Sequence, residues 1–211
     1  RVLIPRSANF WANSLPSLHN GVYAGLGVRI SDFRNVLYGG RLSYPSVPSG
    51  GVPHIIVEIG ETIPSRSDRA FGSFGFPIVW NEQVYFSGAA PLTNLPDGVF
   101  ARDVDGGPIA VIADRFNGLA PWIARPFAGA EGLVYVNPGI SAGTGAGISL
   151  YTYDQQWIPI GTYFQPMPDG SVLQSTGISR VGIGGGKVVY SVRVDTANGT
   201  GSGIYLYDIT T

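Results

Sequence analysis

Short apolar runs of strand-forming residues recur along this chain, and glycine, proline or polar residues separate each run from the next. Four of the runs contain a Val-Tyr pair that follows a polar or glycine turn: Val22-Tyr23, Val84-Tyr85, Val134-Tyr135 and Val189-Tyr190. Runs that are rich in Val, Ile, Tyr and Phe and bounded by turn residues are typical of β-strands. The spacing of the pairs, about 50 residues, predicts a repeated all-β unit.

A second and a third apolar run follow the Val-Tyr pairs. The second run begins at glycine in three units and is degenerate in the first: Val36-Leu37-Tyr38, Gly98-Val99-Phe100, Gly147-Ile148-Ser149 and Gly203-Ile204-Tyr205. The third run closes the first three units at residues 54–59, 109–112 and 157–160. Together with the run before each Val-Tyr turn, the pattern predicts four strands per unit, as in a blade of a β-propeller.

The fourth unit ends without a closing strand, whereas the chain begins with apolar residues followed by proline, in the segment Arg1 to Pro5. We therefore expect a strand that contains Val2, Leu3 and Ile4 to pair beside Ile204 and Tyr205 and to complete the fourth unit. A strand from the same chain would close a ring, whereas a strand from a neighbouring copy would link copies into a fibre. The sequence alone leaves both arrangements open.

The predicted fold is thus an all-β, four-bladed β-propeller that forms a single domain over residues 1–211. The 31 glycines and 16 prolines interrupt the chain too often for a long amphipathic helix. The expected blade boundaries are about 10–60, 70–114, 122–162, and 176–211 together with 1–5.

Charge and cysteine content narrow the classes of function. Only 13% of the residues are charged and the formal net charge is −1, so we expect no nucleic-acid partner. No run of about 18 apolar residues is present, so we expect no insertion into a membrane. The absence of cysteine removes disulfides, thiolate metal sites and cysteine nucleophiles. We expect neither a cofactor nor a metal.

Composition also bears on location. Low charge together with abundant Gly, Ser, Thr, Asn and aromatic residues favours an extracellular or cell-surface bacterial protein. The chain opens on arginine and its single methionine is Met167, as expected of a processed secretion product.

We expect long loops between the second and third strands, including one from Arg193 to Ser202, on the same face as the loops that join blades. The loops that join blades carry the candidate binding residues. Aromatic rings beside Arg and Asp side chains suit a sugar or a protein partner, because the ring covers apolar surface while the polar neighbours fix orientation. The candidates are Trp11, Arg66, Asp68, Trp122 and Asp169. A packing role between adjacent blades is the alternative that we favour for the tryptophans, which are Trp11, Trp80, Trp122 and Trp157.

No catalytic constellation stands out. His19 and His54 have no nearby serine in a nucleophile-elbow pattern. Carboxylates for glycosidic cleavage would have to come from different blades, and the candidates stand in no recurring context: Asp32, Asp68, Asp97 and Asp169. The segment from Asp103 to Gly107 begins like a calcium loop but lacks the later oxygen ligands, so we predict a hairpin turn there.

The second unit resembles a known group of proteins. Its segments Phe74-Gly75-Phe76-Pro77, Val84-Tyr85-Phe86-Ser87-Gly88 and Gly98-Val99-Phe100 resemble the repeat of secreted bacterial β-propeller-like proteins, which are often of unknown function and often carry cell-surface sorting signals. The resemblance spans most of the chain and rests on structural motifs. It implies an extracellular setting and a non-enzymatic role without naming a ligand.

These observations favour a non-catalytic extracellular module with a structural or adhesive role. We expect it to associate with itself or with other surface proteins, and self-assembly into a surface filament or matrix is one form of this role. Two alternatives stay open: a lectin-like propeller that binds glycans at the loop-rich face, and a polysaccharide-active enzyme.

Overall fold

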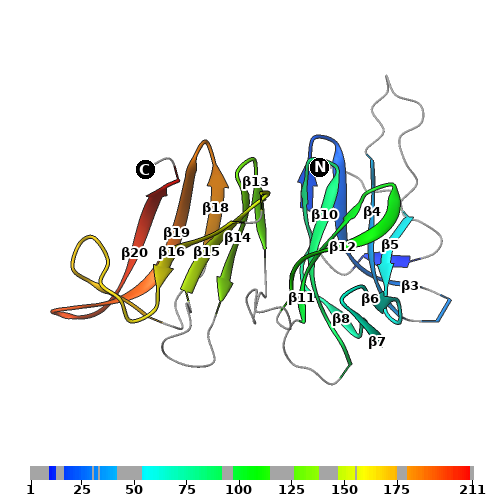
Figure 1. The fold of residues 1–211 in the computed structure, drawn as a ribbon, viewed down its shortest axis with the longest axis horizontal. Helices are drawn as coiled ribbons and strands as arrows, with labels where there is room; N and C mark the ends of the chain where they lie inside the picture. Colours follow the sequence, from blue (N-terminus) through cyan, green and yellow to red (C-terminus); the bar gives the residue numbers. More distant parts are fainter. Residues whose placement is uncertain are drawn as a thin grey trace. The chain divides into compact units, whose positions relative to one another are not determined.

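The computed structural model describes residues 10–12, 17–29, 31, 32, 34–41, 54–91, 97–114, 126–137, 147–154, 156–174 and 180–209. Every regular element within these ranges is a β-strand (Figure 1), which confirms the all-β prediction. The predicted strand that contains Val2, Leu3 and Ile4 lies outside the described residues, as does Trp122. Trp11 is described only as part of the backbone of a strand.

The strands form four larger antiparallel sheets and one two-stranded sheet within the described residues. The first sheet contains β1 (Phe10–Ala12), β2 (Ser17–His19), β3 (Val22–Arg29), β4 (Asn35–Arg41) and β5 (His54–Glu58). The small sheet consists of β6 (Thr62–Ile63) and β7 (Arg66–Ala70). The second sheet contains β8 (Ser73–Phe74), β9 (Ile78–Trp80), β10 (Gln83–Ala89), β11 (Gly98–Asp103) and β12 (Gly106–Asp114).

The remaining two sheets follow in the second half of the chain. The third sheet contains β13 (Phe127–Gly129), β14 (Gly132–Asn137), β15 (Gly147–Thr152) and β16 (Trp157–Thr162). The fourth contains β17 (Val172–Leu173), β18 (Arg180–Gly184), β19 (Lys187–Thr196) and β20 (Gly199–Asp208). The residue ranges of the four larger sheets therefore follow the four predicted units closely. Their arrangement as blades around an axis stays a prediction.

The same strand order recurs in the four larger sheets. An outer strand, interrupted in three of the sheets, pairs with a second strand, as when β1 and β2 both pair with β3. The second strand pairs with a third strand, which is β4, β11, β15 or β20 in the four sheets. In the first three sheets the third strand pairs in turn with a fourth strand: β5, β12 or β16.

The chain divides into two compact units, residues 1–119 and 120–211. The core of the first unit is aromatic, and Phe71 packs edge-to-face against Phe100 with ring centroids 5.0 Å apart. The core of the second unit joins Ile148 and Leu150 of the third sheet to Val188 and Tyr190 of the fourth. In each unit, residues from two larger sheets thus bury a shared set of apolar side chains. The prediction of a single domain stays a prediction.

A β-bulge lies at one repeated position between the third and fourth strands. The register shifts between Leu37 and Tyr38 in β4, and at the corresponding places in β11 and β15, because one residue of the fourth strand has no partner. The unpaired residue is isoleucine each time: Ile56, Ile112 and Ile160. The bulge therefore marks equivalent positions in the three sheets.

The Val-Tyr pairs, by contrast, occupy equivalent positions only in the third and fourth sheets, where Tyr135 lies opposite Ser149 and Tyr190 lies opposite Tyr205. Tyr23 lies opposite Gly40 in the first sheet, Tyr85 opposite Ala101 in the second, and Tyr190 opposite Tyr205 in the fourth. Gly40, Ala101 and Tyr205 lie four, three and two residues after the first residue of their runs, which are Val36, Gly98 and Gly203. The bulge keeps a constant place in the first three sheets, where it lies beside Leu37-Tyr38, Val99-Phe100 and Ile148-Ser149.

Two turn assignments test the sequence interpretation. The segment after Asp103 forms the turn at Val104 and Asp105 between β11 and β12, as predicted. The expected long loop from Arg193 to Ser202 is wrong, because β19 and β20 continue through it to a tight turn at Ala197 and Asn198. Val192 and Val194 are buried, so β19 continues past Arg193 before the chain turns.

Replacing Gly147 tests the close approach of the fourth strand to the third. Gly147 has φ of 152°, and an added Cβ would lie 1.9 Å from the carbonyl oxygen of Gly161 in β16. We expect Gly147→Ala to lower the free energy of unfolding by about 3 kcal/mol, because backbone must move. The measurement is chemical denaturation of the whole chain.

Gly184→Ala is the matched control, since an added Cβ at Gly184 would meet nothing within 4 Å. We expect that variant to stay within about 0.5 kcal/mol of the parent. Equal effects at the two positions would contradict the packing argument.

Candidate functional site at the β20 edge

The hairpin of β19 and β20 has one buried and one exposed face. Burial alternates along β19, where Val188, Tyr190, Val192 and Val194 are buried and the intervening residues are more exposed. Successive side chains of a strand point to opposite faces, so the alternation in the sequence divides the hairpin in this way. The buried face contributes to the core of the second unit.

The exposed face of the hairpin carries an apolar patch where polar residues would be expected. Ile204 is 79% exposed, Leu206 is 63% exposed, and Val189 lies directly opposite Leu206 in the sheet. Lys187 and Asp208 flank the patch, with Lys187 Nζ 2.5 Å from Asp208 Oδ2. We call Val189, Ile204 and Leu206 the β20 patch. Such a concentration of exposed apolar side chains marks a candidate interaction surface.

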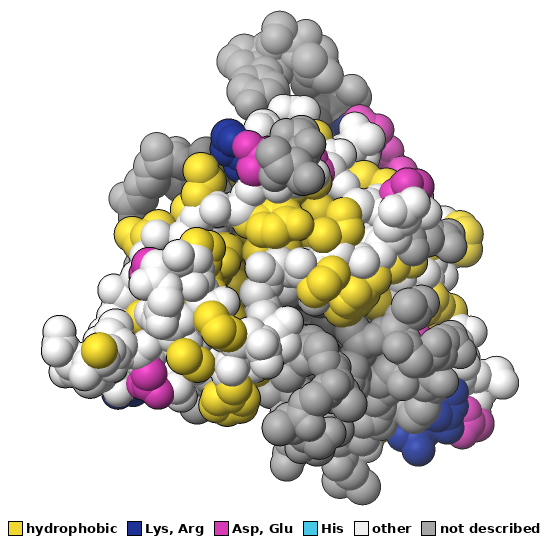
Figure 2. Space-filling view, turned by 60° about the vertical axis from the view of Figure 1, so that its left-hand side comes forward, with side chains coloured by type: hydrophobic (Ala, Val, Ile, Leu, Met, Phe, Trp, Pro, Cys, Tyr) yellow, Lys and Arg dark blue, Asp and Glu magenta, His cyan; other side chains and the backbone are white. Residues whose placement is uncertain are grey.

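The patch lies on a strand at the edge of its sheet. Among the described residues β20 pairs only with β19, whereas the equivalent third strands β4, β11 and β15 each pair on both sides. Within the described ranges β20 is therefore the outermost strand of its sheet (Figure 1). The backbone groups on the outer side of an edge strand can pair with a further strand. Figure 2 shows hydrophobic side chains exposed in several places on the face that it presents, while charged side chains lie mainly toward the outline.

Hydrogen bonds hold the opposite face of β20 in place. The Tyr205 hydroxyl donates to Asp169 Oδ2 at 3.0 Å and lies 2.8 Å from Ser171 Oγ, while the Ser171 hydroxyl donates to Asp169 Oδ1 at 2.6 Å. The Ser171 hydrogen bonds lower the pKa of Asp169, and burial raises the pKa of Tyr205. The Tyr205 ring also stacks on Tyr190, with centroids 5.8 Å apart.

Asp169 and Tyr205 are therefore neighbours, although the sequence assigned them different roles. The sequence predicts that Asp169 binds a ligand and that Tyr205 serves in assembly. In the structure the carboxylate positions the tyrosine and so supports β20. No sequence signal pairs them, because they lie 36 residues apart.

The other predicted binding pair, Arg66 and Asp68, lies in β7 of the first unit. Arg66 donates from Nε to Asp68 Oδ1 at 3.0 Å and from a terminal nitrogen to Oδ2 at 3.1 Å. The arginine lowers the pKa of Asp68. Two parallel hydrogen bonds of this kind orient both groups toward each other.

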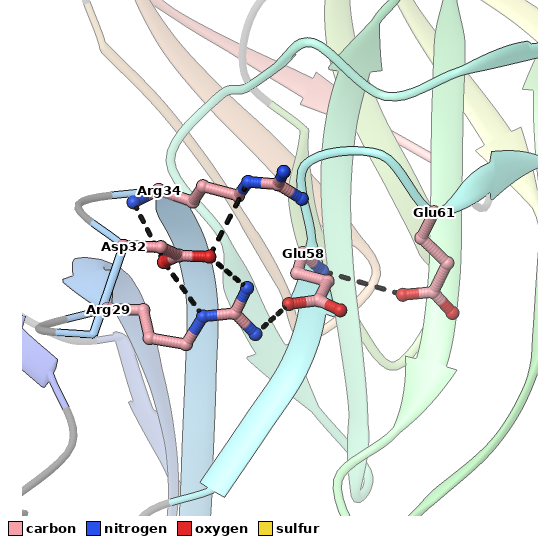
Figure 3. A network of polar contacts seen from close by, with 5 residues as sticks. All are labelled: Arg29, Asp32, Arg34, Glu58 and Glu61. Carbon is pink, nitrogen blue, oxygen red and sulfur yellow. Dashed lines mark hydrogen bonds and ion pairs between the residues drawn. The ribbon is translucent and has the colours of Figure 1, made fainter.

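A larger polar network, which sequence reasoning missed, ties loops to strands in the first unit (Figure 3). Arg29 at the end of β3 pairs with Asp32 in the β3–β4 turn and with Glu58 of β5. Asp32 also accepts the backbone N–H of Arg34 at 3.3 Å. Glu61 accepts the Glu58 backbone N–H and pairs with Arg102 of β11 at 2.8 Å. Through Arg102 the network reaches the second sheet.

Further polar contacts join the first and second sheets. Arg41 pairs with Glu82 and with Asp105, both at 2.8 Å, and these residues lie in turns of the second sheet. His54 Nε2 lies 2.6 Å from the Val104 carbonyl oxygen. His19 packs on Trp80 with ring centroids 4.1 Å apart, which fits the packing role expected of that tryptophan. The two histidines thus make structural contacts.

Within the part of the chain that the structure describes, no group of three or more His, Asp or Glu side chains is arranged to hold a metal ion. The same described ranges contain no helix able to cross a membrane.

In comparisons with known proteins, no protein-family model matches this chain, and no curated protein is similar to it. The resemblance to secreted propeller-like proteins therefore stays an expectation. The site is defined by its geometry alone.

The pH dependence of stability tests the network of Figure 3. Hydrogen bonds from Arg29, with further contributions from Arg34, lower the pKa of Asp32 to about 2, from 3.8. A depressed pKa means that the carboxylate stabilises the folded state above its unfolded pKa, and that this contribution is lost as pH falls through about 2. We expect Asp32→Asn to lower the urea midpoint near neutral pH, with the difference from the parent shrinking below about pH 4.

Asp154→Asn, at an exposed aspartate in the turn after β15, serves as the control. We expect it to leave the midpoint close to that of the parent across the same pH range. A loss in Asp32→Asn that stays constant from neutral to acid pH would contradict an ionic role for Asp32.

Proposed function

We propose that this chain is a non-catalytic structural or adhesive module that associates with copies of itself through the β20 edge. The observation that carries the proposal is the β20 patch on an edge strand. Main-chain groups of a free edge pair readily with another strand, and neighbouring apolar side chains add burial to that pairing. Soluble monomers ordinarily protect such edges with charge, proline or a covering segment.

The polar groups of the molecule support a structural role over a catalytic one. Arg66 and Asp68 bind each other, and the network around Arg29 joins turns and strands of the first unit. Asp169 is engaged by Ser171 and Tyr205. Side chains committed to contacts of this kind position sheets and loops, which favours the structural reading over sugar binding or glycosidic cleavage.

The proposed setting is the cell surface or extracellular matrix, supported by the low charge, the abundance of Gly, Ser, Thr, Asn and aromatic residues, and the resemblance to secreted repeat proteins. We further propose that the four larger sheets are blades of a four-bladed propeller, whose fourth blade is completed by the strand from Val2 to Ile4. The recurring strand order and bulge support this fold.

Placing positive charge on the β20 patch tests the self-association. We expect the parent mass, measured by light scattering, to rise with protein concentration, and the variant Ile204→Lys/Leu206→Lys to stay monomeric. Lysine at an edge opposes pairing because its ammonium group would have to lose water on association. Both side chains are exposed, so the fold should tolerate the change, which circular dichroism checks.

The control variant Ala197→Lys/Asn198→Lys adds the same charge at the tip of the hairpin, away from the patch. It should associate like the parent. A parent chain that is monomeric at every concentration would overturn the proposed function.

A further inference from the structure

The dipeptide asparagine-glycine stands at two turns within the described residues. Asn20-Gly21 joins β2 to β3, and Asn198-Gly199 leads from the turn after β19 into β20. A third pair, Asn117-Gly118, lies outside the described residues. Glycine has no side chain to hinder its backbone nitrogen, so this nitrogen can attack the side-chain carbonyl carbon of the preceding asparagine. The two described turns therefore carry the same chemistry in different surroundings.

The reaction of such a pair is deamidation through a succinimide ring. The glycine nitrogen loses its proton and forms a bond to Cγ of the asparagine, and the side-chain nitrogen leaves as ammonia. Water then adds to either ring carbonyl and opens the ring to aspartate or isoaspartate. Each event consumes one water, releases one ammonia and adds one negative charge at neutral pH. Water is the only co-reactant.

The turn at Asn198 is open to solvent. Every residue from Asp195 to Thr200 is exposed, and an added Cβ at Gly199 would meet nothing within 4 Å. The Thr196 hydroxyl donates to the Gly199 carbonyl oxygen at 2.8 Å and accepts the Asn198 backbone N–H at 3.3 Å. Thr196 and Gly199 form the last pair between β19 and β20, and such an end opens more readily than the middle of a hairpin.

The turn at Asn20 is held in place by its neighbours. Asn20 has φ of 48° and Gly21 has φ of 79°, the left-handed conformation of a tight two-residue hairpin turn. The preceding residue, His19, packs on Trp80 with ring centroids 4.1 Å apart. His19 Nδ1 also accepts the backbone N–H of Asn81 at 3.4 Å. These contacts fix the turn against the second sheet.

We infer that Asn198 is a modification site, at which the folded chain deamidates spontaneously and in preference to Asn20. Ring closure requires the turn to deform until the glycine nitrogen reaches the side-chain carbonyl carbon. That deformation costs less where nothing packs against the turn. The inference goes beyond the proposed function, because it concerns the tip of the hairpin and not the β20 patch.

The product would change both the charge and the backbone of the hairpin tip. Asp195 accepts hydrogen bonds from the Thr200 hydroxyl at 3.1 Å and from the side-chain amide of Gln174. A carboxylate at position 198 adds a like charge three residues from Asp195, where repulsion opposes the closed turn. Isoaspartate in addition inserts a methylene group into the main chain at this point.

Peptide mapping of the incubated chain tests the inference. Cleavage after arginine places Asn20 and Asn198 on separate peptides, residues 7–29 and 194–211. The folded chain is incubated in mildly alkaline buffer made with heavy-oxygen water, and mass spectrometry then measures the acid products. We expect about tenfold more product at Asn198 than at Asn20, with one oxygen atom from the solvent in each product.

Two controls separate the effect of the fold from that of the dipeptide. In the chain unfolded by urea, the two sites should react at similar rates, because the packing that protects Asn20 is gone. Asn198→Gln should remove the product at position 198 and leave the rate at Asn20 unchanged, since the longer side chain closes a ring far less readily. Circular dichroism checks that this variant folds.

Three results would overturn the inference. The first is equal product at the two sites of the folded chain, and the second is more product at Asn20. The third is a preference for Asn198 that persists unchanged in urea, because the local sequence and not the fold would then decide the rate.

Discussion

The pairing of the third strand with a bulged fourth strand is the interaction on which the sheets of this protein depend. A β-strand at a sheet edge exposes a row of hydrogen-bonding groups, and the fourth strand satisfies them. Its unpaired isoleucine bends the strand locally. Glycine at the start of β11 and β15 lets the two backbones approach, because an added Cβ at Gly147 would lie only 1.9 Å from the Gly161 carbonyl oxygen. In the three sheets that contain the fourth strand, the residues Leu37, Val99 and Ile148 beside the bulge are fully buried.

Polar side chains have a different task, which is to connect sheets and loops. Arg102 links the second sheet to Glu61 beside the first, and Arg41 reaches two turns of the second sheet. These ion pairs are partly or largely exposed, so each contributes modestly to stability. Their value lies in fixing the direction of loops that apolar packing does not reach.

The fourth sheet combines a packed inner face with an exposed apolar outer face. Its hairpin has a well-packed inner face, supported by the Tyr205, Ser171 and Asp169 hydrogen bonds. Its outer face and edge carry Ile204 and Leu206 in water. A well-packed strand that pairs on one side only within the described residues is a suitable acceptor, because little order is lost when a second strand pairs with it.

The sequence by itself determined the all-β class, the residue ranges of the four larger sheets and the turn after Asp103, because strand periodicity and turn residues are local signals. The prediction that a further strand pairs beside Ile204 and Tyr205 stays a prediction. The sequence interpretation misplaced a loop at Arg193 to Ser202. It also treated all four Val-Tyr pairs as equivalent, although only those of the third and fourth sheets are, while the bulge is common to the first three sheets. Only the tertiary structure decided that Asp169 supports Tyr205, that Arg29 meets Glu58, and that Ile204 is exposed while Ile148 is buried. Such contacts join residues far apart in the chain, and burial depends on what packs against a strand, which local residue patterns do not encode.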